Sequence, residues 1–289
     1  MSTRFNNLSQ LYKGVSDVVN TFHKFFATLF TLGVLAMILY PLVILVSASL
    51  RTTQQVTENP LGLPFDPNLG NFVDAWIDGG FQQYFLNSIF IVLVTLAILL
   101  VVCSLAAYAL VELEVPGKRL LAMSVIAGFM LPAQALFIPN FSIMNQIGLL
   151  DTSWSLILSY IGFSIPFTFF LIYQSFNSLP PGYADAARVE GVSEIGIFAR
   201  IYVPLSLPSM MAVVVVQFVW LWNEFLYALT FITTDAKRTV PAGLMQFNSF
   251  LTTQWDLYAA GIIIAVAPAV IIFYLFQTYF IEGFSRGRL

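Results

Sequence analysis

Six long apolar segments run through this chain, and they constrain its fold more than any other feature. A helix needs about 20 apolar residues to cross the roughly 30 Å hydrocarbon core of a bilayer. The six segments cover residues 25–50, 85–111, 120–143, 154–176, 210–232 and 259–281. A membrane-spanning strand would alternate apolar and polar residues, whereas these segments are apolar throughout and contain a single charged residue, Glu224. The sequence therefore predicts an all-α integral membrane protein with six transmembrane helices.

The scarcity of charge excludes several functional classes. Charged residues make up 9% of the chain, against roughly 25% in soluble domains. Because the net charge is −3 and no basic cluster occurs, we expect no nucleic acid partner. The one histidine, His23, would have to act alone at a membrane surface, and no GxxxxGK[ST] phosphate-binding motif occurs. We therefore predict a non-catalytic chain that has no catalytic residues and itself binds no metal or cofactor.

Lysine and arginine indicate the orientation, because loops rich in them stay on the cytoplasmic side during insertion. With the N-terminus inside, nine of the 12 basic residues fall in inner segments and three in outer ones. The inner residues are Arg4, Lys13, Lys24, Lys118, Arg119, Arg188, Arg200, Arg286 and Arg288. The outer residues are Arg51, Lys237 and Arg238. We therefore predict a multi-pass membrane protein with both termini cytoplasmic, whose longest outer loop, 51–84, is irregular or short-helical.

A polar segment, residues 177–208, interrupts the apolar sequence between the fourth and fifth predicted spans, on the cytoplasmic side. The prolines at 180–181 can start a helix, because proline is tolerated in a first turn, and the three alanines that follow favour helix strongly. Gly191 stands where a glycine would end that helix. Ser193 can cap a second helix, which we expect Pro204 to end. The pattern predicts a helix, a glycine turn and a second helix along the membrane surface.

Composition alone leaves two interpretations of this segment open. The small alanines make the first helix slim enough to enter a groove on another protein, while Asp185, Arg188 and Glu190 reach sideways for polar partners. Alternatively, the helix is amphipathic and rests on lipid headgroups. The spacing of the residues favours the first interpretation.

That spacing resembles the EAA signature of permease subunits in binding-protein-dependent ABC importers. The matched residues are Asp185, Ala186, Ala187, Gly191, Ile201, Val203 and Pro204. Asp185 replaces the family's Glu and Val203 its Leu, so charge and apolar character are kept. In that family the segment forms coupling helices that dock in a cleft of the cytoplasmic ATPase. The resemblance implies ATPase-coupling roles for Tyr183, Ala184, Asp185, Ala186, Ala187, Arg188, Glu190, Gly191, Ile201 and Pro204.

Other motifs extend the resemblance over nearly the whole chain, to the second permease of maltose-type carbohydrate importers. They are, in family order, "AAYALVELEVPGKR", "MLPAQALFIPNF", "IGLLDT", "WNEFLYAL", "TVPAGL" and "FQTYFIEGF". The resemblance implies a single transmembrane domain over residues 1–289, with 177–208 as its coupling loop. Related chains often end in a Gly-Ala-Val-Lys-Gly-like tail, whereas this one ends in "SRGRL".

The same resemblance implies an assembly in a prokaryotic cytoplasmic (inner) membrane. Its other members are a second homologous permease, two cytoplasmic ATPase domains that bind ATP and magnesium, and an extracytoplasmic solute-binding protein that delivers a sugar or oligosaccharide, with membrane lipid around the permeases. Three alternatives stay open: import of a non-sugar solute, secondary transport without an ATPase, and a purely structural membrane subunit. A secondary transporter needs several ion-coupling groups near the midplane of the membrane, whereas Glu224 is the one charged residue in the predicted spans.

Two sets of residues are candidates for contact with the solute or its carrier. Pro132 can bend a helix beside the pathway or merely improve packing. We expect Asn223 and Glu224 to face the bundle interior, either to hold helices together or to line the pathway or a gate, because a lipid-facing carboxylate is costly. By resemblance, Gln246, Phe247 and Asn248 in the outer loop reach toward the binding protein. The alternative is that this loop packs on the protein's own outer surface.

Overall fold

The computed structural model of the chain describes residues 2–248 and 253–285. Within these residues four helices are long and apolar enough to cross a membrane: Lys24–Ser49, Phe81–Glu112, Ser153–Asn177 and Trp255–Gln277. Two bent helix pairs pass the same test if each pair counts as one span, which gives up to six. The predicted all-helical class is confirmed over the described residues. Arg286 and Arg288, assigned above to the cytoplasmic side, lie outside them.

The third predicted span, 120–143, is not straight. It consists of α5 (Lys118–Ala127) with the 3-10 turn η1 (Gly128–Met130), followed by η2 (Ala133–Leu136) and α6 (Phe137–Gln146). The two halves meet at an angle of 93°. The break falls at Leu131 and Pro132, since proline has no N–H to donate and pushes the preceding residue into extended backbone.

The fifth predicted span, 210–232, is also interrupted. Helix α11 (Leu207–Trp222) ends before Asn223, and α12 (Leu226–Phe231) begins three residues later. In the first turn of α12 the backbone N–H groups of Tyr227 and Ala228 donate to the carboxylate of Glu224, at 2.9 and 3.2 Å. A side chain thus replaces the carbonyls that an unbroken helix would supply, which is a condition for breaking a helix in apolar surroundings.

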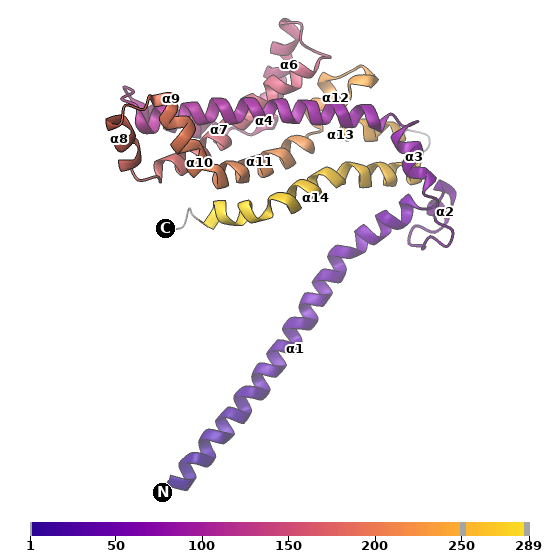
Figure 1. Cartoon of the computed structure of the whole chain (residues 1–289). Coiled ribbons are helices and arrows are strands. Elements are labelled where there is room, and N and C mark those ends of the chain that lie inside the picture. The colour runs from indigo at the N-terminus through magenta and orange to yellow at the C-terminus, as the bar shows by residue number, and fades with distance from the viewer. Residues whose placement is uncertain (1, 249–252, 286–289) are drawn as a thin grey trace.

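The remaining elements are short and lie at the two ends of the bundle. At one end are α2 (Thr53–Glu58), α3 (Gly70–Trp76), η4 (Asp235–Lys237), α13 (Val240–Gly243) and η5 (Leu244–Phe247). At the other end are α8 (Gly182–Val189), α9 (Glu194–Ile197), the π-helical turn η3 (Phe198–Tyr202) and α10 (Val203–Leu205). Figure 1 shows α3 and α8 at opposite ends of α4.

The bundle is built on α4 (Phe81–Glu112), which packs along α7 (Ser153–Asn177) and against α11, while α11 packs on α14 (Trp255–Ser285). Two buried apolar clusters fill it. One lies toward α3 and α13 and contains Phe81, Tyr160 and Trp222. The other, which we call the inner cluster, lies toward α8 and contains Phe176 and the lone cysteine, Cys103, buried as a core residue.

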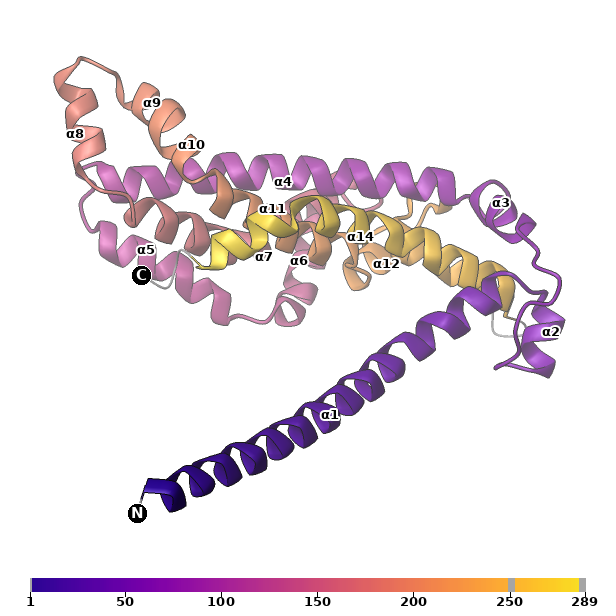
Figure 2. The same cartoon turned by 60° about the horizontal axis from the view of Figure 1, so that its bottom comes forward.

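Helix α1 (Ser2–Ser49) stands apart from this bundle. It contacts α14 near its C-terminal end and otherwise extends away from the other helices (Figures 1 and 2). Its large apolar side chains are exposed along the span, Met37 at 79% for example. A helix that is apolar all round needs apolar surroundings, which hydrocarbon or a neighbouring chain can supply.

Candidate functional site

The polar segment folds as the sequence predicts over most of its length. Helix α8 ends at Val189, Gly191 adopts a left-handed backbone with φ of 79°, and the Ser193 hydroxyl accepts the N–H of Gly196 at 3.3 Å. The second helix is formed by α9, η3 and α10 without a gap and ends at Leu205, next to Pro204, as the sequence predicts. The chain then bends by 72° before α11.

Gly191 makes the sharp turn between α8 and α9. Its N–H donates to the carbonyl of Arg188 at 3.0 Å, and the N–H of Val192 donates to that of Ala187 at 3.0 Å. These bonds satisfy the last carbonyls of α8, as a left-handed glycine does at a helix end. The direction in which α9 leaves α8 therefore depends on this one residue.

Two of the three alanines of α8 pack against this chain itself, whereas the sequence suggested that all three make the helix slim for a groove on another protein. Ala184 and Ala187 are buried, at 0% and 8% exposure, and pack in the inner cluster with Phe176 and Tyr202. Their small size lets α8 lie close against this chain's own helices. Of the three alanines only Ala186 is exposed. Ala184 and Ala187, for which the resemblance implied ATPase coupling, therefore pack within this chain.

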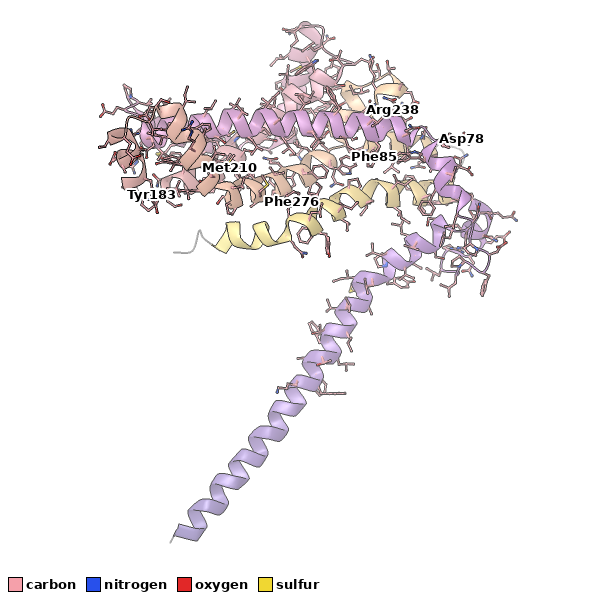
Figure 3. The ribbon with its side chains drawn as sticks, in the orientation of Figure 1. Asp78, Phe85, Tyr183, Met210, Arg238 and Phe276 are labelled. Atoms are coloured by element: carbon pink, nitrogen blue, oxygen red, sulfur yellow. The ribbon has the colours of Figure 1, made fainter. Side chains whose placement is uncertain are left out.

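The exposed side of α8 carries large apolar side chains beside its acids, which sequence reasoning missed. Val189 is 90% exposed and Tyr183 is 52% exposed, and Ile195 of α9 is 79% exposed. Tyr183 stands at the end of the molecule in Figure 3. The acids Asp185 and Glu190 are exposed on the same helix. Large apolar side chains on a polar segment indicate a surface that another molecule covers.

Arg188 does not reach outward as predicted, because three carboxylates of this chain surround it. Its guanidinium contacts Glu112 at 2.9 Å, Glu194 at 2.8 Å and Asp185 at 3.1 Å. The hydrogen bonds to Glu194 and then to Glu112 raise the pKa of Arg188 further above its usual range. The guanidinium fork suits such multiple carboxylate contacts.

Two tyrosines complete this group, which we call the arginine cluster: Arg188, Glu112, Glu194, Asp185, Tyr108 and Tyr202. Tyr108 donates to Glu194 at 2.5 Å, and Tyr202 donates to Glu112. The cluster ties α8 to α9, to η3 and to the last turn of α4. Because its members are far apart in sequence, no local pattern identified Glu112 as a partner of Arg188. Ile201 is half-buried against the same inner cluster, and Pro204 is exposed.

Tyr227 links two of the three candidate pathway positions, Glu224 and the backbone beside Pro132. The hydroxyl of Tyr227 donates to the carbonyl of Ala133, next to Pro132, at 2.9 Å. The backbone N–H of Tyr227 donates to Glu224, and the hydroxyl of buried Tyr160 donates to the same carboxylate at 2.7 Å. The two broken spans therefore meet. Asn223 lies on the exposed side, with its amide on its own helix.

The outer loop residues are held mainly by the protein's own surface. Phe247 is buried at 4% exposure and stacks on Phe81, with ring centroids 5.6 Å apart. The amide of Gln246 donates to the carbonyl of Gly79. Asn248 is exposed and pairs with Thr253 across the gap in the described chain. Of the three residues, Phe247 packs on the protein's own outer surface, which was the alternative to contact with the binding protein.

Asp151 fixes the beginning of this outer loop, and sequence reasoning missed it. Its backbone is left-handed with φ of 59°, and its carboxylate accepts the N–H groups of Thr233 and Thr234 at 2.9 and 2.8 Å. Lys237 contacts the same carboxylate at 3.0 Å. Hydrogen bonds from Thr234 above all hold the pKa of Asp151 well below its usual range.

Comparisons with known proteins agree with this architecture. Residues 104–286 match the family described as binding-protein-dependent transport system inner membrane component. A probable ABC transporter permease, YurM, from Bacillus subtilis is 36% identical over 252 residues, 87% of this chain and 84% of that one. The trehalose transport system permease SugB from Mycobacterium tuberculosis is 32% identical, covering 87% of this chain and 92% of that one.

One further relative and one solved structure are also similar to this chain. The diacetylchitobiose uptake permease NgcG from Streptomyces coelicolor is 31% identical, covering 86% of this chain and 83% of that one. A bacterial ABC transporter involved in import of the polysaccharide alginate shares the fold, with a TM-score of 0.77 at 22% identity over 88% of this chain and 95% of that one. The chain therefore belongs to the inner membrane components of binding-protein-dependent transport systems, the permeases of ABC transporters.

Proposed function

We propose that this chain is a permease subunit of an ATP-driven importer that takes up a sugar or oligosaccharide. The observation that carries the coupling part of the proposal is the exposure of two large apolar side chains of α8, Val189 and Tyr183, on a helix that the arginine cluster ties to α4. The sugar class is supported by relatives named for trehalose, diacetylchitobiose and arabinooligosaccharide transport. The alternative is import of a non-sugar solute, and uptake measured with a panel of sugars and non-sugar solutes distinguishes the two.

In this proposal residues 1–289 form one transmembrane domain with six spans, two of them bent, and both termini are cytoplasmic. The chain itself is non-catalytic. It pairs with a second homologous permease, and two separate ATPase domains bind ATP and magnesium. An extracytoplasmic binding protein delivers the solute. Segment 177–208 is the coupling loop, and α8 docks on an ATPase domain.

Rigid contacts explain how docking at α8 moves the spans. When the ATPase domains close on ATP, α8 moves with the domain on which it docks. The contact between Arg188 and Glu112, 2.9 Å long, transmits that motion to the end of α4, and α4 packs along α7. Helices linked by short, well-packed contacts move as one body, which is what switching the pathway between two orientations requires.

Val189→Asp tests the docking surface. We expect the ATPase to stop co-purifying with the permease, with affinity reduced about 30-fold, because a charge placed in the centre of an apolar interface costs about 2 kcal/mol or more. Ser178→Asp adds the same charge on an exposed position of the loop outside α8 and is the control. ATPase recovery and ATP-dependent uptake in proteoliposomes are measured for both variants.

Two outcomes would overturn the proposal. The first is unchanged ATPase recovery with Val189→Asp. The second is solute uptake that proceeds without any ATPase and stops when the proton or sodium gradient is dissipated, as a secondary transporter requires.

Arg188→Met tests the transmission step separately from docking. Arg188 is engaged by this chain's own acids, so we expect the ATPase to remain bound while uptake per ATP hydrolysed falls about tenfold, which corresponds to about 1.4 kcal/mol. Arg188→Lys, which keeps the charge but loses the fork, should lie between Met and the parent. Equal uptake per ATP in all three proteins would contradict this role.

A further inference from the structure

Three aromatic side chains from three different elements pack on one another outside the two buried clusters. They are Phe129 of η1, Phe167 of α7 and Trp220 of α11, and we call them the aromatic row. The ring centroids of Phe129 and Phe167 are 5.9 Å apart, and those of Phe167 and Trp220 are 5.1 Å apart. Phe129 is 58% exposed, Trp220 is 50% exposed, and Phe167 is half-buried. The aromatic row is therefore a continuous surface that this chain leaves partly uncovered.

The aromatic row lies within the predicted membrane region, beside both broken spans. Trp220 follows Leu207, the first residue of α11, by 13 residues, or about 20 Å at about 1.5 Å per residue. Figure 3 labels Met210 near the start of this helix. Phe129 lies in the turn that precedes the break of the third span, and Trp220 lies in the last turn before the break of the fifth. Helices are broken inside a membrane where they are buried in protein or line a water-filled cavity, and in transporters such helices form solute sites.

Uncharged polar groups accompany the aromatic row. Asn223 follows Trp220 by three residues, so both lie on one face of the helix end, and both are exposed. The amide of Asn223 donates to the carbonyl of Val219 at 2.8 Å, and within residues 2–248 and 253–285 its oxygen has no hydrogen-bond partner. In the same described part of the chain, neither the indole N–H of Trp220 nor the side-chain amide of exposed Gln134 in η2 has one. Free donors and acceptors are costly against lipid, so a polar molecule is the better occupant of this surface.

The charges near the aromatic row narrow the chemistry of that molecule. The six apolar segments contain no lysine or arginine, and their one charged residue is Glu224, next to Asn223. The Glu224 carboxylate already accepts hydrogen bonds from Tyr160, Tyr227 and Ala228. An anionic solute would find no basic partner on this chain and would be repelled by Glu224. A neutral sugar ring fits, because its C–H groups can stack on an aromatic face while its hydroxyls bond to amides at the edge.

We propose that the aromatic row and Asn223 form a contact site for a neutral sugar ring inside the membrane, and that this site disfavours acidic sugars. The proposal rests on the proposed function, which supplies a sugar as the solute. Trp220 stacks on the face of the ring, and Asn223 and Gln134 bond to its hydroxyls. Phe167 and Phe129 continue the aromatic surface, so a second ring of an oligosaccharide can lie along it.

Trp220→Ala tests the stacking contact. Saturation-transfer NMR on the purified importer, without its binding protein, measures the binding of free trehalose, a neutral disaccharide. The importer is measured without nucleotide and with its ATPase trapped by vanadate. In the state in which the parent binds more tightly, Trp220→Ala should weaken binding about tenfold, because the largest stacking face is lost. Trp220→Phe, which keeps a ring, should lie between alanine and the parent.

Trp154→Ala is the matched control. Trp154 is 48% exposed and begins α7 outside the aromatic row, so its loss should leave trehalose binding unchanged. Equal binding by the parent and Trp220→Ala would overturn the proposal. So would loss of the second permease from the purified Trp220→Ala assembly, which would identify the aromatic row as a subunit interface.

A second pair of probes tests the charge of the solute. Diacetylchitobiose is neutral, whereas an alginate trisaccharide carries carboxylates. We expect the parent to bind the neutral probe at least tenfold more tightly than the acidic one. Equal or tighter binding of the alginate trisaccharide would overturn the neutral class. If the parent takes up sugars with ATP and its binding protein but binds none of the three probes, this inference alone fails. If no sugar is taken up with ATP, the proposed function fails instead.

Discussion

Gly191→Pro is expected to abolish ATP-dependent uptake while the protein stays in the membrane. Proline holds φ near about −65°, whereas Gly191 has φ of 79°. Proline also removes the N–H that donates to the carbonyl of Arg188. The turn must therefore refold, and α8 loses its orientation relative to α9. A misfit of about 3 kcal/mol corresponds to a loss of about 100-fold or more in coupled uptake.

Gly191→Ala is the matched control for this prediction. No heavy atom lies within 4 Å of a Cβ added at this position, so alanine meets only the backbone penalty, which is about 1–2 kcal/mol for a left-handed residue. We expect reduced stability with most of the uptake retained. Membrane content, ATPase co-purification and uptake are measured for both variants. Normal ATPase recovery and uptake with proline at position 191 would refute the role of this turn.

Ala187→Glu would not test docking of the coupling loop on the ATPase, although the sequence suggests it because the alanines make the helix slim. Ala187 is 8% exposed and packs in the inner cluster of this chain. A glutamate there would disturb the fold of the loop before any partner is involved. Ala186, exposed on α8, is the alanine at which added bulk tests docking.

Glu224→Ala is expected to destabilise the permease severely. The carboxylate accepts hydrogen bonds from the hydroxyl of Tyr160 and from the backbone N–H groups of Tyr227 and Ala228. Tyr160 is 1% exposed, so water does not readily replace the lost acceptor. An unsatisfied buried donor costs about 1–3 kcal/mol, so three donors left without an acceptor would cost roughly 3–9 kcal/mol. Thermal unfolding of the detergent-solubilised assembly measures it.

Glu224→Gln separates the two roles considered for this residue. Glutamine keeps the shape and one acceptor oxygen. If Glu224 holds helices together, Gln should lie between Ala and the parent in stability, with an unchanged solute concentration for half-maximal uptake. If it lines the pathway, that solute concentration should change while stability is retained. Normal assembly and parental uptake in both variants would exclude both roles.

Some features of the fold follow from sequence because their causes are local. Runs of about 20 apolar residues predict membrane helices, since the thickness of the bilayer sets the length. The prolines before α8 and the glycine after it predicted that helix, because each acts through its own backbone angles. For the outer loop 51–84 the composition left irregular and short-helical structure both open, and the structure has the short helices α2 and α3 there.

The bends were only partly predictable. Pro132 indicated a possible break in the third span, but the angle of 93° depends on what the two halves pack against. No proline or glycine near Asn223 predicts the break there. It exists because Glu224 folds back onto the N–H groups of α12 and because Tyr160, some sixty residues earlier in sequence, completes the carboxylate's hydrogen bonds.

By itself the sequence determined the membrane class, the number of apolar segments, the helix–turn–helix of the coupling loop and, through motif resemblance, the transporter family. Only the tertiary structure decided which way the side chains of that loop face. It turned Ala184 and Ala187 inward, left Val189 exposed and placed Arg188 beside Glu112 of α4. Backbone propensities act within a few residues, whereas packing and ion pairing depend on distances between segments that the chain brings together only when it folds.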